Sequence, residues 1–221
     1  MSSVKNILLN KISCKSIWFM RQAGRYLPEF RKIRSENKDF IKLCLNSELS
    51  SEITLQPIKR FDLDSAIIFS DILMVPFALG QDVNFIKNNG PNLSNFNLKF
   101  FLNNNEKDFT KKLSPIYKAI EITRKKLKKN KSLISFVGAP WTLLVYMLGL
   151  KKNKKEIDLK KLKSNTSELD IIFSELTKYL CIHIKNQINA GADVVQIFDS
   201  WAGLIPNKNI KNYCFIPNKE I

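Results

Sequence analysis

The sequence predicts an α/β fold with parallel strands, and two observations support this prediction. Short apolar runs typical of buried strands alternate along the chain with longer segments of helical periodicity. Such alternation favours a parallel sheet covered by helices. Polar or small residues also follow the apolar runs, at Arg21, Asp71, Gly138 and Ser200. Because ligands bind at the carboxyl ends of parallel strands, we expect these four positions to line one mouth.

Length and composition indicate one globular domain that spans residues 1–221. The chain is 44% hydrophobic and 25% charged, which is ordinary for a protein with a packed core. No apolar run approaches the roughly 20 residues that a membrane span needs. The N-terminus also lacks the apolar centre of a secretory signal. We therefore expect a cytoplasmic protein with no membrane partner.

The cysteines indicate neither a disulfide framework nor a metal site. They are widely separated in sequence and form no CxxC or Cys/His ligand spacing. We expect reduced, isolated thiols at Cys14, Cys44, Cys181 and Cys214.

The formal net charge of +16 comes mostly from lysine runs such as 124–131 and 150–163. Such runs usually cover solvated helix faces. Nucleic-acid binding is the alternative, and it would show steep salt dependence. It would also interleave aromatic with basic residues, and the lysine runs contain almost none. We therefore expect no nucleic-acid partner, although a positive field would speed encounter with a polyanionic small molecule.

The first part of the chain is expected to contain two strands and two helical stretches. The apolar runs 18–20 and 66–69 have the composition of buried parallel strands. Pro28 occupies a favoured first helical position. Residues 40–60 are expected to be mostly helix, because apolar residues recur there every four positions. Pro57 is expected to end or kink this helix.

The second part alternates in the same way. Residues 81–105 are rich in Asn and lack periodicity, which indicates an irregular excursion or a hairpin. A helix is expected over 109–127, and a strand over 132–140 that runs into a short apolar helix. One or two helices are expected over 159–189, and a final strand over 194–198.

The stretch IWFMRQAGRYLPEFRKIR, residues 17–34, is the most unusual segment of the sequence. It places Arg21, Arg25, Arg31 and Arg34 among aromatic and apolar residues. Guanidinium groups form bidentate pairs with carboxylate or phosphate, and the apolar neighbours suit a ring. This combination predicts a large ligand that carries several negative charges. The alternative is an amphipathic, solvated segment that begins a helix.

The same stretch resembles the N-terminal signature of the uroporphyrinogen decarboxylase family. Three later blocks resemble that family in the same order, and they are AIIFSDIL, VGAPWTLLVYM and VVQIFDSWAG. A single block is compatible with chance, whereas four in order cover nearly all of the chain. The resemblance implies a (β/α)8 TIM barrel and a homodimer. It also implies removal of four acetate carboxylates from uroporphyrinogen III, without cofactor or metal, to give coproporphyrinogen III in haem biosynthesis.

Only about four strands are visible, whereas a (β/α)8 barrel needs eight strands in typically about 250 residues. We therefore expect this chain to be an incomplete barrel that lacks the C-terminal strands. The family's substrate-contacting histidine near the C-terminus would then lie outside the chain. The single histidine, His183, lies in a helical pattern, matches nothing in the family and is expected to have a structural or surface role.

The resemblance also implies a set of site residues. Asp71 matches the family's aspartate, and Arg21 matches the arginine to which the proton-donor role has been assigned, so these are the expected catalytic residues. The expected substrate-binding residues are Arg21, Gln22, Ala23, Gly24, Arg25, Arg34, Asp71, Tyr146 and Ser200. Among them, Gln22, Ala23 and Gly24 would contribute loop backbone. Arg31 and Lys32 have no match and are expected to be solvated.

Several of these residues also have an ordinary structural interpretation. Without the resemblance, Asp71 and Ser200 would be interpreted as caps of the segments that follow them. Tyr146 would be a core tyrosine with a satisfied hydroxyl group, and Phe198 an inward-facing core residue. A guanidinium has a pKa above about 12, so Arg21 would donate its proton only from a strongly perturbed site.

Two other functions remain open from the sequence. A corrinoid or thiol methyltransferase of the related fold would need a zinc site of His and Cys ligands, a spacing that the sequence lacks. A non-catalytic remnant would keep the anion pocket and bind a polycarboxylated tetrapyrrole without turnover.

Overall fold

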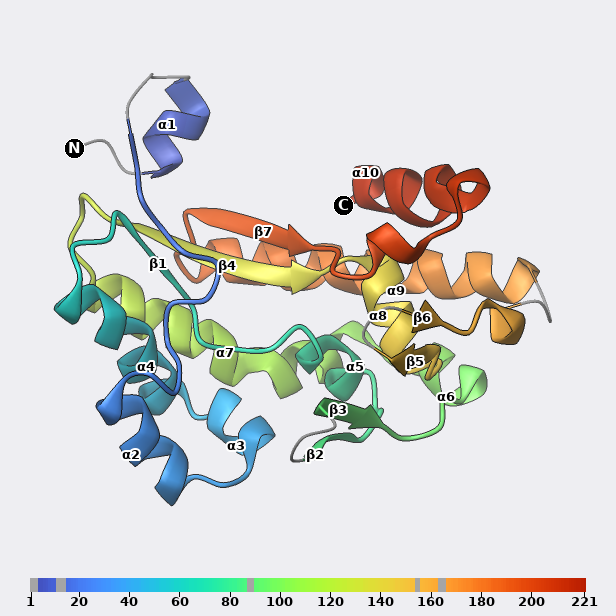
Figure 1. Cartoon of the computed structure of the whole chain (residues 1–221), viewed down its shortest axis with the longest axis horizontal. Coiled ribbons are helices and arrows are strands. Elements are labelled where there is room, and N and C mark those ends of the chain that lie inside the picture. The colour runs from blue at the N-terminus through green and yellow to red at the C-terminus, as the bar shows by residue number, and fades with distance from the viewer. Residues whose placement is uncertain (1–3, 11–14, 87–89, 154–155, 163–165) are drawn as a thin grey trace. The chain divides into compact units, whose positions relative to one another are not determined.

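The computed structural model describes residues 4–10, 15–86, 90–153, 156–162 and 166–221. Helices and strands alternate along these residues, as predicted (Figure 1). The helices are α1 (Val4–Asn10), α2 (Pro28–Glu36), α3 (Phe40–Cys44), α4 (Ser47–Arg60), α5 (Met74–Ala78), α6 (Leu98–Leu102), α7 (Glu106–Lys126), α8 (Pro140–Met147), α9 (Thr166–Asn189) and α10 (Ile216–Glu220). The strands are β1 (Ser65–Ile67), β2 (Val83–Ile86), β3 (Gly90–Leu93), β4 (Ser132–Gly138), β5 (Lys151–Asn153), β6 (Glu156–Ile157) and β7 (Val194–Phe198).

The chain divides into two compact units, each with its own core. The first unit consists of Met1–Asp71, Leu113–Phe136 and Ile184–Gln196. The second unit consists of Ile72–Lys112, Val137–His183 and Ile197–Ile221.

The main sheet has the strand order β1-β4-β7. β1 pairs with β4 in parallel, with Ser65 opposite Ser132 and Ile67 opposite Ile134. The N–H of Ile68 extends this ladder by donating to the Ile134 carbonyl at 2.9 Å. Parallel neighbours that are distant in sequence require crossover connections, and helices lie between these strands in the chain. Three of the four expected strands are therefore confirmed.

The fourth expected strand, Trp18–Met20, is wrong, because the chain there is irregular. Ile17 accepts a hydrogen bond from the Asp64 N–H at 2.9 Å and donates to the Asp64 carboxylate at 2.7 Å. Beyond this point, the side chain of Gln22 donates a hydrogen bond to the carbonyl of Ser65 in β1 at 2.8 Å. It also accepts one from the N–H of Ile67 in the same strand at 3.4 Å. A neighbouring strand would need these same two groups, so strand pairing stops here.

Residues 40–60 form two helices rather than one. The side chain of Asn46 accepts a hydrogen bond from the Leu49 N–H at 3.1 Å and caps the start of α4. The helix does not end at Pro57, since α4 continues to Arg60. Pro57 has no N–H to donate to the carbonyl of Ile53, so one hydrogen bond of the helix is missing there.

The remaining predictions agree with the structure. Residues 81–105 contain an antiparallel hairpin of β2 and β3, followed by α6. The expected helix at 109–127 is α7, and the apolar helix after β4 is α8. Residues 159–189 contain a 3-10 turn and α9. The short antiparallel pair of β5 and β6 was not predicted.

The core of the first unit lies next to β1. It consists of Leu27, Phe30, Ile33, Leu43 and Ile53, with Ala23, Leu49 and Phe69 packed against it. Full burial of one such large apolar side chain contributes roughly 1.5–3 kcal/mol. Helices α2, α3 and α4 are therefore fixed against the segment that follows β1.

The core of the second unit contains several aromatic rings. Trp141 is completely buried, and its ring stacks on Tyr213 with 5.3 Å between centroids. Phe109 is also completely buried and lies 4.8 Å from Tyr179 and 6.4 Å from His183, measured between ring centroids. The buried position of His183 in α9 agrees with the structural role that we expected.

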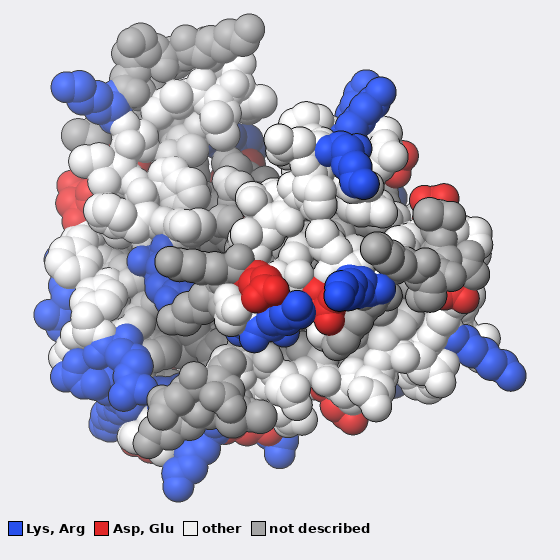
Figure 2. Space-filling view, turned by 45° about the vertical axis from the view of Figure 1, so that its right-hand side comes forward, with Lys and Arg blue, Asp and Glu red and all other residues white. Residues whose placement is uncertain are grey.

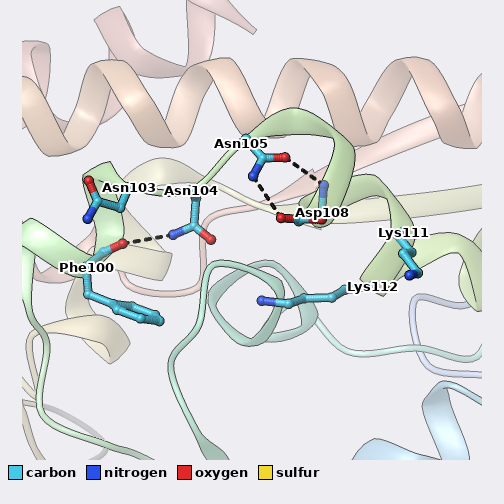
Figure 3. Close-up of a pocket in the computed structure, with 7 residues that line it drawn as sticks. All are labelled: Phe100, Asn103, Asn104, Asn105, Asp108, Lys111 and Lys112. Carbon is cyan, nitrogen blue, oxygen red and sulfur yellow. Dashed lines mark hydrogen bonds between the residues drawn. The ribbon is translucent and has the colours of Figure 1, made fainter.

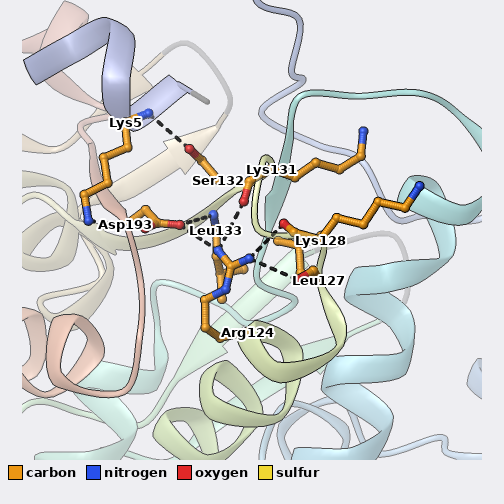
Figure 4. A network of polar contacts seen from close by, with 8 residues as sticks. All are labelled: Lys5, Arg124, Leu127, Lys128, Lys131, Ser132, Leu133 and Asp193. Carbon is orange, nitrogen blue, oxygen red and sulfur yellow. Dashed lines mark hydrogen bonds and ion pairs between the residues drawn. The ribbon is translucent and has the colours of Figure 1, made fainter. Parts of the chain in front are cut away.

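A polar network holds the first unit together at the beginning of β4 (Figure 4). The Asp193 carboxylate accepts from Arg124 Nη1 at 2.8 Å and from the N–H of Leu133 at 2.9 Å. Arg124 also donates to the carbonyl groups of Leu127, Lys128 and Lys131. Because each charged group has several partners in fixed positions, the network restrains the end of α7 against β4.

The surface charge is dispersed. Figure 2 shows lysine and arginine side chains scattered over one face, with acidic side chains between some of them. This distribution agrees with the prediction that the lysine excess is solvated. Among the described helices, none has the length and apolar character that crossing a bilayer requires.

We expect Asp193→Asn to lower the free energy of unfolding by about 2 kcal/mol, because a partly buried guanidinium loses its anion. Denaturant unfolding followed by circular dichroism measures the change. Asp170→Asn is the matched control, since Asp170 is exposed on α9, and it should change the value by less than about 0.5 kcal/mol. Equal unfolding midpoints for both variants would contradict the role given to the network.

Burial lowers the pKa of His183 from 6.5 to about 3. The unfolded chain therefore binds a proton that the folded chain rejects, so this stabilisation is present above pH 6.5 and is lost as the pH falls toward 3. Between pH 7.5 and 5.5, His183 should remove about 1.4 kcal/mol from the free energy of unfolding. In His183→Gln, urea unfolding should show a decrease in the free energy of unfolding over this pH interval that is smaller by that amount. If the free energy of unfolding of both proteins changes equally with pH, the pKa of His183 is not lowered.

Candidate active site

The arginine segment is a folded loop that leads into α2. The side chain of Gln22 is buried against β1, and Ala23 packs on the apolar core of the first unit. The Leu27 N–H donates to the Gly24 carbonyl at 3.0 Å and closes a turn. Because the side chains in the middle of the loop point inward, the flanking arginines are left on the outside. This arrangement fits the expectation that the middle residues contribute only backbone to a binding surface.

Two further side chains hold the loop. Arg31 is exposed, as expected, but its Nη1 donates to the carbonyl of Arg25 at 2.7 Å and to that of Tyr26 at 3.3 Å. The Tyr26 hydroxyl donates to the carbonyl of Gln22. The prediction that Arg31 is merely solvated missed this role. The signal was its place in the first turn of α2, where side chains point back toward the helix start.

Arg21 and Arg25 are exposed, and no described residue forms an ion pair or hydrogen bond with either guanidinium. Exposed apolar side chains accompany them in the segment. Ile17, Phe19, Met20 and Tyr26 are between 57% and 65% exposed. Free cations beside exposed apolar side chains match a ligand that has an apolar body and anionic groups.

Arg34 is half-buried on α2. Its guanidinium carbon lies 5.7 Å from the centroid of the Phe40 ring, and Nη1 donates to the carbonyl of Asn37. Phe40 meets the ring of Phe69 edge-on at 5.9 Å between centroids. The aromatic ring therefore orients the cation without neutralising it.

Asp71 follows β1 and is half-buried. Two side chains of α4 fix the backbone just before it, because the Phe69 N–H donates to Thr54 Oγ1 at 2.8 Å and Ser50 Oγ donates to the Phe69 carbonyl. Asp71 does not occupy the N-cap position of α5. The N-cap residue of α5 is Leu73, and no side chain caps that helix.

The thiol of Cys44 is buried at the end of α3 and is influenced by nearby charged groups. Burial raises the pKa of this thiol far above its usual range. The Asp71 carboxylate raises the pKa further, whereas the Arg34 guanidinium lowers it. Both charges therefore act on the same buried sulfur atom, and both residues belong to the first unit.

Tyr146 and Ser200 lie close together in the second unit. Tyr146 is half-buried on α8, and its ring meets that of Trp201 edge-on with 5.9 Å between centroids. Ser200 directly precedes Trp201 and is exposed just after the half-buried Phe198 that ends β7. Ser200 is not a helix cap, since Trp201 is the N-cap of the next turn. Neither hydroxyl group is hydrogen-bonded to a residue that the structure describes.

Sequence reasoning missed the residue that holds Ser200. The Thr142 hydroxyl donates to the Asp199 carboxylate at 2.7 Å and accepts from the Trp201 N–H at 3.1 Å. Thr142 lies one helical turn before Tyr146 in the block VGAPWTLLVYM, and this spacing was the available signal.

Gly138 ends β4, and its role is steric. A Cβ atom at this position would lie 2.7 Å from Leu143 Cδ2 and 3.1 Å from the Cβ of Ile72. Because Ile72 follows Asp71 directly, a larger residue here would displace the chain next to that carboxylate.

Two hollows in the second unit involve none of the expected site residues. The first, of about 580 Å³, is lined by Phe100, Asn103, Asn104, Asn105, Asp108, Lys111 and Lys112 (Figure 3). Its amides are engaged locally, with Asn104 Nδ2 donating to the Phe100 carbonyl and Asn105 Nδ2 to the Asp108 carboxylate. The second, of about 260 Å³, is lined by residues of α5, of α6 and of the segments next to them, and by Met147 of α8. Neither hollow therefore bears on the expected site.

No metal-binding cluster occurs within the described ranges, which contain no group of three or more His, Cys, Asp or Glu residues suited to an ion. Cys44, Cys181 and Cys214 are free thiols there, and Cys14 lies outside those ranges. A zinc site of the methyltransferase kind is therefore not found among these residues.

Known proteins resemble this chain over most of its length. The family model "Uroporphyrinogen decarboxylase (URO-D)" matches residues 9–221. A uroporphyrinogen decarboxylase of Orientia tsutsugamushi (strain Ikeda) is 47% identical over 207 residues, which cover 93% of this chain and 60% of that protein. One of Rickettsia bellii (strain RML369-C) is 43% identical over 209 residues, which cover 93% and 61%. The chain thus spans about 60% of the length of these curated relatives.

A solved structure supports the fold class. A methyltransferase from Methanosarcina mazei matches with a TM-score of 0.73 over 96% of this chain and 63% of that chain. The identity is only 16%, so this likeness concerns the fold alone. The parallel order β1-β4-β7 fits part of a (β/α)8 TIM barrel, which is the fold of the matched family. By its family model and these relatives, the chain belongs to the uroporphyrinogen decarboxylase family.

Proposed function

We propose that the protein containing this chain converts uroporphyrinogen III to coproporphyrinogen III in haem biosynthesis, by removing four acetate carboxylates as CO2. Membership of the family supports this proposal, as do relatives that carry the name uroporphyrinogen decarboxylase. The observation that carries it is the exposed pair of Arg21 and Arg25 beside exposed apolar side chains, in the same unit as Asp71. These residues offer cations for carboxylates and an anion for a cationic ring.

The reaction needs a place for the electrons of the broken carbon–carbon bond. A proton added to an electron-rich pyrrole makes the ring cationic. When CO2 leaves, the bond electrons neutralise the ring and leave an exocyclic methylene group. A second proton converts this group to methyl as the ring loses the first proton. The ring itself is the electron sink, so the proposed reaction uses no cofactor and no metal.

Asp71 would stabilise the cationic ring. An ionised carboxylate offers roughly four acceptor sites, which suits the converging N–H groups of a folded macrocycle. Its charge would act most strongly on the transition state, where the positive charge is greatest. The hydrogen bonds that Phe69 donates to Thr54 and accepts from Ser50 would keep the carboxylate from moving during the reaction, because they fix the backbone before it.

The arginines would bind the carboxylates of the substrate. Each charge-assisted hydrogen bond contributes about 1.5–3 kcal/mol, so Arg21, Arg25 and Arg34 together would determine which acetate lies at the reacting position. Tyr146 and Ser200 would bind further carboxylates through their hydroxyl groups. Arg21 is also the proposed proton donor. Because this side chain is exposed, donation requires that the bound substrate removes water from around it.

We further propose that the protein works as a homodimer in the cytoplasm. The homodimer rests on the family resemblance of the four sequence blocks, and the location on the expectation from sequence composition.

We expect Asp71→Asn to lower kcat at least about 100-fold with a smaller change in KM, since the amide keeps the shape but not the charge. Anaerobic incubation with uroporphyrinogen III, with products separated by carboxylate number, measures both constants. Asp82→Asn is the control, because Asp82 is exposed just before β2, and it should keep wild-type turnover.

Wild-type turnover by Asp71→Asn would show that the carboxylate has no part in the chemistry. If the unmutated protein binds uroporphyrinogen III without turnover, the chain belongs instead to a non-catalytic tetrapyrrole-binding protein.

Arg25→Met should raise KM about tenfold, through loss of one charge-assisted contact, and leave kcat within about threefold of wild type. Lys32→Met removes the same charge from an exposed position on α2 and should leave KM within about twofold of wild type. The same anaerobic assay compares them. Equal increases in KM would mean that the overall positive field, and not a specific contact, attracts the substrate.

A further inference from the structure

We propose that Thr142 and Asp199 are positioning residues, which hold Ser200 and Tyr146 for substrate binding through a hydrogen-bonded relay. The inference rests on the proposed function, because it concerns the same binding site. All four residues belong to the second unit.

The hydroxyl group of Thr142 lies at the centre of this relay. It donates to Asp199 Oδ1 at 2.7 Å and accepts from the backbone N–H of Trp201 at 3.1 Å. These two partners flank Ser200 in the sequence, so one hydroxyl group holds both sides of the turn that carries Ser200. The Ala202 N–H also donates to the Asp199 carbonyl at 3.2 Å and closes the turn.

Asp199 anchors the turn to the C-terminal segment as well. Its Oδ2 accepts from Asn218 Nδ2 at 3.3 Å. Burial raises the pKa of the Cys214 thiol, and the Asp199 carboxylate raises it further as an acceptor and as a charge. A carboxylate with several fixed partners serves to hold neighbouring groups in place. The relay therefore fixes Ser200 against both α8 and the end of the chain.

Tyr146 is connected to the same relay. Thr142 and Tyr146 are one turn apart on α8, so their side chains leave the same face of the helix. The ring of Trp201 meets that of Tyr146 edge-on at 5.9 Å, and the Trp201 carbonyl accepts from Trp141 Nε1 at 3.0 Å. Trp201 is thus held at its N–H and at its carbonyl, and it supports the ring of Tyr146.

The relay leaves the two binding hydroxyl groups available. Thr142 and Trp141 are completely buried, whereas Ser200 is exposed and Tyr146 is half-buried. Within the described part of the chain, the hydroxyl groups of Ser200 and Tyr146 have no hydrogen-bond partner. Their positions are therefore determined by residues that do not themselves face a ligand, which lowers the entropy lost on binding.

Thr142→Val tests the relay, because valine has the shape of threonine without a donor or acceptor. We expect KM for uroporphyrinogen III to rise about five- to tenfold, with kcat within about twofold of wild type. Thr142→Ser keeps the hydroxyl group and should restore the wild-type KM. Thr177→Val is the matched control. Thr177 is buried in α9, its hydroxyl has no hydrogen-bond partner among the described residues, and its KM should equal that of wild type.

The double variant Thr142→Val with Ser200→Ala tests the route of the effect. If Thr142 acts through Ser200, the increase in KM is smaller than the product of the two separate increases. An increase equal to that product would overturn the positioning role. So would a Thr142→Val protein with the KM of wild type.

Hydrogen exchange separates this inference from the proposed function, since it needs no substrate. The Trp201 amide should exchange at least about tenfold faster in Thr142→Val and at the wild-type rate in Thr142→Ser. Unchanged exchange in Thr142→Val would overturn the relay whatever the activity. Faster exchange in a protein whose wild type binds uroporphyrinogen III without turnover would overturn only the proposed decarboxylation. The dissociation constant would then replace KM in the same comparison and decide the positioning role.

Discussion

The side-chain amide of Gln22 occupies the edge of β1 in place of a neighbouring strand. It donates to the carbonyl of Ser65 and accepts from the N–H of Ile67. Gln22 is buried, with a relative exposure of only 3%. A buried backbone group left without a partner costs about 1–3 kcal/mol. Without the Gln22 amide, both the Ser65 carbonyl and the Ile67 N–H would lose this partner. The arginine loop is attached to the same strand that leads to Asp71. The spacing between the loop and that carboxylate therefore depends on this contact.

The guanidinium groups of Arg25 and Arg34 form no ion pair with a described residue. Arg34 rests on the Phe40 ring and on the carbonyl of Asn37, neither of which carries a formal charge. Arg31 holds the Arg25 backbone and so leaves the Arg25 guanidinium outside. An ion pair with a protein carboxylate would have satisfied these cations and removed them from use. Aromatic and carbonyl partners fix their positions and keep their charge for an anionic ligand.

The sequence predicted those features that depend on local pattern. The strands β1, β4 and β7 follow from short apolar runs, and α7 follows from its periodicity. The prediction of a strand at 18–20 was wrong because the side chain of Gln22 occupies the backbone hydrogen-bonding groups of β1 that a neighbouring strand would use. Sequence periodicity does not reveal such a contact. Arg31 and Thr142 were missed for a similar reason, since both act on backbone groups of another segment. The roles of the site residues and the single domain over 1–221 stay predictions.

The expected binding residues differ in chemistry between the two units. Those of the first unit include Arg21, Arg25, Arg34 and Asp71, which carry charge, whereas Tyr146 and Ser200 in the second are neutral hydroxyl donors. Under the proposed function, each decarboxylation removes one anion from the ligand. The attraction by guanidinium groups then falls at every step, because it depends on ligand charge, whereas hydrogen bonds to hydroxyl groups depend on it less. The guanidinium groups would therefore hold the substrate more tightly than the final product, which favours release of the product.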